Sequence, residues 1–160
     1  MAAARRAGRY GLALLANANV AGMQEAYEAA CHEHGHVPGP TLLPERDHSS
    51  VVFVADDVDQ AWSELGEHLL HDARTYAAWN PGNRTSAGFS HVTTVAELRE
   101  AAASHVIISV PEAISRVRAG QILNLAPLCG GLRPEIAWPY LERVGDVVLP
   151  EALSERKTPL

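Results

Sequence analysis

Three runs of hydrophobic residues along the chain are each followed by a pattern typical of an amphipathic helix. The runs cover residues 11–18, 49–55 and 122–128. The second run, in SSVVFVAD, is β-branched and almost wholly apolar, which is typical of a parallel strand covered by helices on both faces. This alternation predicts an α/β protein with parallel strands and right-handed crossovers. We expect the three strands to lie side by side in sequence order.

The helices predicted after these runs have recognisable start signals. The first is expected over residues 19–35, and the segment VPGPTLLPE after it is interpreted as a loop because of its prolines. The second is expected over residues 57–79, with Asp57 as N-cap. Its core-facing stripe consists of Val58, Trp62, Leu65, Leu69, Ala73 and Tyr76. The last helix is expected to begin at Pro134, and Pro139 should kink it or split it in two.

Between the second and third units the signals are mixed. Residues 81–90 show no periodicity and are interpreted as an exposed insertion. Thr94 and Glu97 form a capping box that opens a short helix. HVIISV is a short run of β type, and Pro111 fits the first turn of another helix.

Composition narrows the class of protein. The chain has 160 residues and a formal net charge of −6, so nothing favours binding to nucleic acid or to an anionic membrane. Cys31 and Cys129 are the only cysteines, a usage that suits a cytoplasmic location. The amino terminus has some features of a secretory signal, but Asn17 and Asn19 interrupt its apolar patch. Residues 151–160 are expected to form a frayed tail.

Two polar segments could carry chemistry. CHEHGH holds Cys31 and three histidines, but residues two apart on a helix point in different directions, and the helix dipole favours histidines at its carboxyl end. We expect no native metal site there. ADDVD carries three carboxylates at a helix start, where anions are favoured without any function. Asp56 nevertheless ends a parallel strand, at the edge where α/β proteins bind ligands, and is therefore a candidate for lining a site.

The segment HLLHDARTYAAWN offers two polar pairs at helical spacing on the second predicted helix. His71 and Arg74 share one face, and so do Asp72 and Tyr76. Either pair could face a cavity, but the spacing alone favours a solvated helix surface with Tyr76 in the core. The chain has no glycine-rich dinucleotide motif, Walker loop, nucleophile elbow or C-x-x-C pair.

The third run ends in the glycine pair Gly130-Gly131. Such a pair is needed where something approaches the backbone closely or where the backbone takes a positive φ. From the sequence alone, the second reason is favoured.

Five stretches, taken in order, resemble the carboxyl-terminal part of the luciferase-like flavin-dependent oxidoreductases. They are ARRAGRYG, EAYEAACHEHGHVPG, VVFVADDVDQAWSELGEHLLHDARTYAAWN, PEAI and LAPLCGGLRPEIAWPYLERVGDVVLP. This group includes bacterial luciferase, alkanesulfonate monooxygenases and deazaflavin-dependent dehydrogenases. The resemblance covers residues 4–150. It implies a (β/α)8 TIM barrel, of which this chain supplies the last three parallel strand–helix units, with an insertion at about 81–110.

The resemblance also implies a cofactor and a place for the site. FMN or a reduced deazaflavin would lie across the carboxyl ends of the strands and react with oxygen or a small-molecule substrate. The glycine pair would then leave room at the mouth of the barrel. Candidate lining residues are Asn17, Asp56, Cys129, Gly130 and Gly131, with His71 or Tyr76 as a lid. No metal is expected.

A complete barrel needs about 250 residues, whereas this chain has 160. We therefore expect the chain to be inactive without the amino-terminal half, and to bind flavin weakly or not at all by itself. Three strands would leave sheet edges uncovered, so we expect it to form homo-oligomers or to assemble with a chain supplying that half. The alternative is a non-catalytic half-barrel that acts as an assembly partner or is a truncated remnant.

Overall fold

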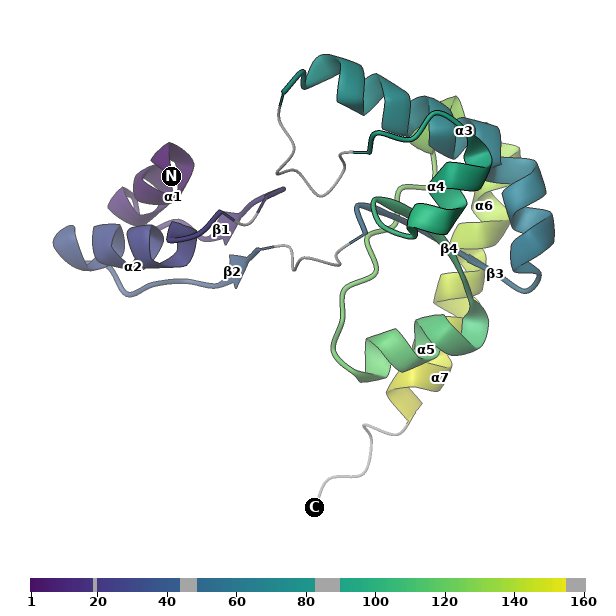
Figure 1. The fold of residues 1–160 in the computed structure, drawn as a ribbon. Coiled ribbons are helices and arrows are strands. Elements are labelled where there is room, and N and C mark those ends of the chain that lie inside the picture. Colours follow the sequence, from purple (N-terminus) through teal and green to yellow (C-terminus); the bar gives the residue numbers. More distant parts are fainter. Residues whose placement is uncertain (19, 44–48, 83–89, 155–160) are drawn as a thin grey trace. The chain divides into compact units, whose positions relative to one another are not determined.

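The computed structural model describes residues 1–18, 20–43, 49–82 and 90–154 (Figure 1). They form two compact units, the first ending at Leu43 and the second comprising the two later ranges. Both units combine helices with short parallel strands. The α/β class and the parallel pairing are therefore confirmed. No helix among these described residues is both long and apolar enough to cross a bilayer.

The first unit packs two helices against each other beside a two-stranded sheet. Its elements are α1 (Ala2–Arg9), β1 (Leu14–Leu15), α2 (Met23–Glu33) and β2 (Thr41–Leu42). Gly8 lets α1 approach α2 closely, because a Cβ there would lie 2.4 Å from the carbonyl oxygen of Tyr27. The buried Tyr27 hydroxyl donates to the carbonyl of Leu12 and accepts from the amide of Gly39. The helix expected over residues 19–35 is confirmed as the shorter α2.

The strand β2 lies in the proline-rich segment that was expected to be a loop. The amide of Leu14 donates to the carbonyl of Pro40, and the amide of Ala16 donates to that of Leu42. A proline has no N–H, but its carbonyl still accepts, so this segment pairs with β1 in parallel. The first predicted strand therefore has β2 as its neighbour. The prediction that it pairs with the second predicted strand is wrong, since the two belong to different sheets.

The second unit contains the longer strands and most of the helices. Its elements are β3 (Val51–Ala55), α3 (Val58–Trp79), α4 (Val95–Ala101), β4 (His105–Ser109), α5 (Val110–Arg118), the 3₁₀ helix η1 (Cys129–Gly131), α6 (Pro134–Arg143), the π-helix η2 (Val144–Val148) and α7 (Leu149–Ser154). β3 pairs with β4 in parallel over five residues, beginning with Val51 opposite His105. On its other side β3 has a single parallel bridge, between Val52 and Leu125.

The third predicted strand, residues 122–128, is reduced to this bridge. The amide of Val52 donates to the carbonyl of Asn124 at 2.9 Å, and the Asn124 side chain donates to the carbonyl of Ser50 at 2.7 Å. Pro127, which follows soon after, has no N–H to continue a ladder. The second and third predicted strands are thus neighbours, as expected. The full partner of β3 is β4, however, which comes from HVIISV in the region expected to be an insertion.

Both faces of β3 are buried, as its apolar sequence predicts. One face belongs to a cluster that also contains buried residues of α3, α4 and α6. The other face belongs to a cluster completed by α5, η2 and α7, and Figure 1 shows α5 and α7 side by side. The β3 residues in the first cluster are Val51, Phe53 and Ala55, and those in the second are Val52 and Val54.

Four predicted helix starts of the second unit are confirmed, including Pro134 as the first residue of α6. The Asp57 carboxylate accepts from the amide of Gln60 at 2.9 Å, and caps α3. Thr94 and Glu97 form the predicted capping box of α4. Pro111 lies in the first turn of α5, where its missing N–H has no partner to lose.

The described residues end in a continuous helical run formed by α6, η2 and α7. Pro139 does not split α6, contrary to one of the two outcomes expected for it. Because Pro139 has no N–H, α6 lacks the hydrogen bond that residue 139 would otherwise donate to the carbonyl of Glu135, in the first turn of the helix. The irregular part of the run is instead the π-helix η2, after which the run continues as α7.

Two stretches were expected to lack regular structure. Residues 151–154 are helical instead, because Ala152 is buried in the second cluster and fixes the last turn of α7. Residues 155–160 lie outside the described residues. So do residues 83–89, which make up most of the predicted insertion at 81–90.

Candidate functional site

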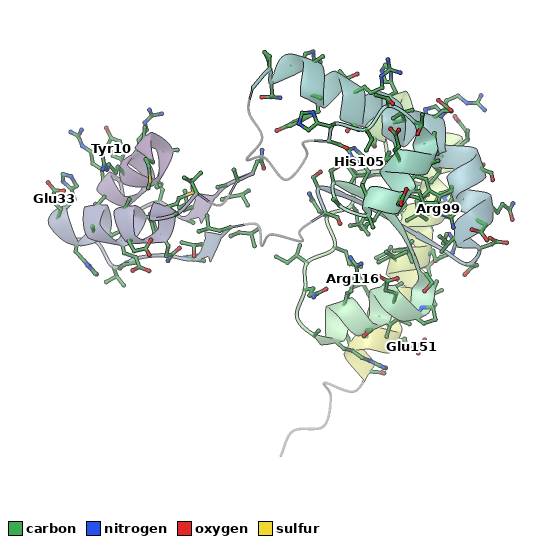
Figure 2. All side chains as sticks on the ribbon, viewed as in Figure 1. Tyr10, Glu33, Arg99, His105, Arg116 and Glu151 are labelled. Atoms are coloured by element: carbon green, nitrogen blue, oxygen red, sulfur yellow. The ribbon has the colours of Figure 1, made fainter. Side chains whose placement is uncertain are left out.

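Three side chains of metal-binding type meet in the second unit. They are Asp72 from α3, His105 from the start of β4 and Cys129 from η1, and one ligand atom from each lies within 4.8 Å of the others. His105 is labelled in Figure 2. Within the part of the chain that the structure describes, no other histidine, cysteine and carboxylate side chains form such a group of three.

The secondary structure explains why two of these side chains face each other. Along β4, His105 and Ile107 point to the same face of the sheet, and Ile107 belongs to the cluster beneath α3. On α3, Asp72 lies between the buried Leu69 and Ala73 in sequence, at the border of the buried stripe. The carboxylate therefore reaches the imidazole at the amino-terminal end of β4.

Both ring nitrogens of His105 have hydrogen-bond partners. Nε2 lies 2.9 Å from Oδ2 of Asp72, and Nδ1 lies 2.9 Å from the hydroxyl oxygen of Ser104. The His105 side chain is 1% exposed. Burial lowers the pKa of His105, although the Asp72 carboxylate opposes this shift. The imidazole is therefore neutral at pH 7; Nε2–H donates to Asp72, and Nδ1 accepts from Ser104.

Cys129 completes the cluster from the opposite side. Its thiol is buried, and burial together with the neighbouring Asp72 carboxylate raises the thiol pKa above its usual range. The sulfur thus remains protonated at neutral pH. Because the thiolate is the reactive form of cysteine, Cys129 is a poor nucleophile in this state.

The glycine pair that follows Cys129 is needed for backbone geometry. Gly130 has φ of 60° and Gly131 has φ of 73°, which confirms the favoured reason for the pair. Close approach also applies at Gly130, where a Cβ would lie 1.9 Å from the carbonyl oxygen of His68 on α3. The ring of His68 donates from Nδ1 to the Gly130 carbonyl at 3.1 Å. A helix backbone, rather than a cofactor, is what approaches this glycine.

A second polar group lies at the carboxyl end of β3. The Asp56 carboxylate pairs with the guanidinium of Arg143 at 2.8 Å, and Arg143 also donates to the carbonyl of Val54. The same guanidinium lies 5.6 Å from the centre of the Tyr140 ring. The Tyr140 hydroxyl donates to Glu64 at 2.5 Å, and burial followed by this carboxylate raises the pKa of Tyr140. These polar side chains therefore pair with one another at the carboxyl end of β3, where a ligand was expected.

Within the second unit, the structure does not gather the residues predicted to line a site. Asp56 follows β3 at its carboxyl end, whereas Cys129 lies beside His105, which is opposite Val51, five residues before Asp56 and about 16 Å away along the strand. His71 is exposed on α3, and Tyr76 is partly buried there. Asn17 belongs to the first unit and is exposed.

The chain of hydrogen bonds from Ser104 through His105 to Asp72 has the residue types of a serine hydrolase relay. Ser104 is only 2% exposed, however, so no substrate carbonyl reaches its hydroxyl. The arrangement holds the start of β4 against α3. It provides no nucleophile.

No family model, curated protein or solved structure matches this chain. Its chemistry is therefore argued from the residues themselves.

Sequence reasoning considered Asp72 and Cys129 separately and missed His105. HVIISV was interpreted only as a short run of β type, and no role was assigned to the histidine at its start. The three positions are 33 and 24 residues apart along the chain, and no local motif connects such distances. The available signal was the alternation of β4, which places His105 on the face that the apolar stripe of α3 covers.

Proposed function

We propose that this chain contributes the last strand–helix units of a luciferase-like oxidoreductase barrel that uses FMN or a deazaflavin. The observation that carries this proposal is the parallel bridge between Val52 and Leu125. It makes neighbours of two strands that the resemblance assigns to the carboxyl-terminal part of the barrel. The burial of β3 on both faces also suits a strand of such a fold.

The described residues beside β3 and the Leu125 segment do not form a pocket of flavin size. A cavity between β3 and the Leu125 segment, lined by Val52, Leu125, Tyr140 and their neighbours, has a volume of about 10 Å³. Pockets for cofactor-sized ligands measure roughly 300–1,000 Å³. At the carboxyl end of β3, Asp56 and the Val54 carbonyl already engage Arg143. We therefore assign no reaction step to these residues, and activity depends on further strands from the same polypeptide or another chain.

A flavin titration tests this proposal. The bound flavin would supply the redox chemistry, while the protein orients it and excludes water. FMN fluorescence should change little when this chain is added alone, because most contacts are absent. It should be quenched when the chain is co-expressed with a polypeptide carrying the remaining strands. Micromolar binding by the chain alone would contradict the dependence on further strands, and no binding by the assembled pair would contradict the flavin proposal.

The alternative function, a non-catalytic assembly partner, is favoured by apolar side chains in the third predicted strand. Ile122 is 53% exposed and Leu128 is 58% exposed, and a further strand or a second copy would cover them. Light scattering on the purified chain should therefore show a species larger than a monomer. A sharp monomer peak with cooperative melting would exclude this role.

A further inference from the structure

The cluster of Asp72, His105 and Cys129 has the chemistry of a zinc site. A thiolate, an imidazole and a carboxylate are ligands that zinc takes in proteins, and the combination of sulfur with imidazole favours zinc over magnesium or calcium. The three ligands come from α3, β4 and η1, so the fold assembles them from distant parts of the sequence. We propose that Asp72, His105 and Cys129 bind one zinc ion, with a water molecule in the fourth position.

The distances bring the three ligand atoms within 4.8 Å of one another, and each must shift to hold an ion. Ligand atoms around a tetrahedral zinc ion are about 3.3–3.7 Å apart, given metal–ligand bonds of about 2.0–2.3 Å. Nε2 of His105 and Oδ2 of Asp72 are 2.9 Å apart, so they must separate by about 0.5 Å for an ion to fit between them. Asp72 can provide this movement, because its side chain is 39% exposed. The sulfur of Cys129 lies within 4.8 Å of both atoms, so it must move closer by up to about 1.2 Å to complete the site.

Ser104 supports the tautomer that a metal needs. Zinc binds the lone pair of Nε2, so the ring proton must reside on Nδ1 and requires an acceptor there. A serine hydroxyl both donates and accepts, and the Ser104 oxygen is already 2.9 Å from Nδ1. The carbonyl of Ser104 accepts from the amide of Val51 and the hydroxyl of Ser50, which fixes this residue next to the ring.

Charge and access also suit one ion. When Cys129 loses its thiol proton to solvent, the thiolate and the Asp72 carboxylate together balance the two positive charges of zinc. The loaded site is then neutral overall, which limits the cost of burying it. Asp72 is the exposed side of the cluster, and solvent entering there supplies the fourth ligand.

Metal titration of the chelator-treated full chain tests the site directly. Cobalt should bind with a stoichiometry of one and show the absorption of tetrahedral cobalt together with a thiolate charge-transfer band. Zinc should displace it, and should raise the thermal unfolding midpoint where magnesium does not. Cys129→Ser should abolish the charge-transfer band and weaken zinc binding by about 100-fold or more.

Matched controls separate this site from other zinc ligands. Cys31 is the other buried cysteine and lies in the first unit, so Cys31→Ser should keep the band. His32→Gln with His34→Gln removes exposed histidines at the carboxyl end of α2 that could collect metal, and it should also leave cobalt binding unchanged. If Cys129→Ser fails to fold, Asp72→Asn provides the second variant. It should fold, as circular dichroism can verify, and should bind zinc at least 10-fold more weakly.

Four results would overturn the proposal, and the first three concern the cobalt complex. They are a cobalt complex without a thiolate band, a band that persists in folded Cys129→Ser, and a band that disappears in Cys31→Ser. Unchanged zinc affinity in folded Asp72→Asn would also exclude the site as described.

Discussion

Gly130→Ala should destabilise the second unit far more than Gly131→Ala, although both glycines have positive φ. A residue with a side chain in the left-handed region costs about 1–2 kcal/mol, and both variants incur this cost. At Gly131 a Cβ would meet nothing within 4 Å, so little should be added. At Gly130 a Cβ would lie 1.9 Å from the carbonyl oxygen of His68 and 2.6 Å from its carbon.

The size of the difference follows from that overlap. Ordinary van der Waals contact for a Cβ begins near 3.4 Å, so η1 would have to retreat from α3 by about 1.5 Å. The obstacle is helix backbone, which cannot rotate away as a side chain can. Forcing extra atoms into such a contact typically costs about 1–3 kcal/mol. We therefore expect Gly130→Ala to exceed Gly131→Ala by about this amount in lost free energy of unfolding.

Urea denaturation followed by circular dichroism measures both variants under the same conditions. The free energy differences come from the shift of the midpoint, provided that the slopes agree with the parent chain. Equal losses in the two variants would refute the reasoning, because positive φ would then explain the pair and the contact with His68 would be unimportant. A larger loss for Gly131→Ala would refute it as well.

Further predictions concern the cluster of Asp72, His105 and Cys129 and the carboxyl end of β3. In metal-free protein, stability should fall as the pH drops below about 6.5, because the pKa of His105 is lowered by folding and the unfolded chain binds the proton first. His105→Asn should flatten this slope between pH 7 and pH 5 in urea titrations, and an unchanged slope would contradict the assignment. Asp56→Asn should cost less than about 1 kcal/mol, since its carboxylate is largely exposed. Arg143→Ala should cost about 1–2 kcal/mol by the same assay, because it also removes the hydrogen bond to the Val54 carbonyl and the contact with the Tyr140 ring. Equal losses of stability in Asp56→Asn and Arg143→Ala would contradict this reasoning. Cys129 should react with a thiol reagent only after unfolding, and detectably faster in Gly130→Ala, which displaces η1.

In the second unit, the elements that could be predicted are those whose sequence signals come from neighbouring residues. The β-branched run of β3 and the stripe of α3 each permit one interpretation, and both are confirmed with the Asp57 cap, except that Tyr76 is only partly buried and lies outside the core cluster. The capping box of Thr94 and Glu97 was equally clear. In each case the residues that decide the structure are close together in the sequence.

The pairing of strands could not be predicted in the same way. β2 has only two residues, and Pro40 marks a loop although its carbonyl accepts a strand hydrogen bond. The apolar run around Leu125 indicated a full strand, but Asn124 and Pro127 limit it to one bridge. Which apolar run becomes the full neighbour of β3 depends on packing across the whole unit. The metal-type cluster depends on that choice, because β4 carries His105.

The continuous helical run at the end of the chain has a consequence for how the second unit opens. Ala137 of α6 belongs to the cluster on one face of β3, while Val144, Val148 and Ala152 belong to the cluster on the other. One run of helix is thus shared by two cores, and neither core can lose its packing without disturbing the other. Amides on both sides of the sheet should therefore exchange with deuterium through one common opening event, as members of a single foldon.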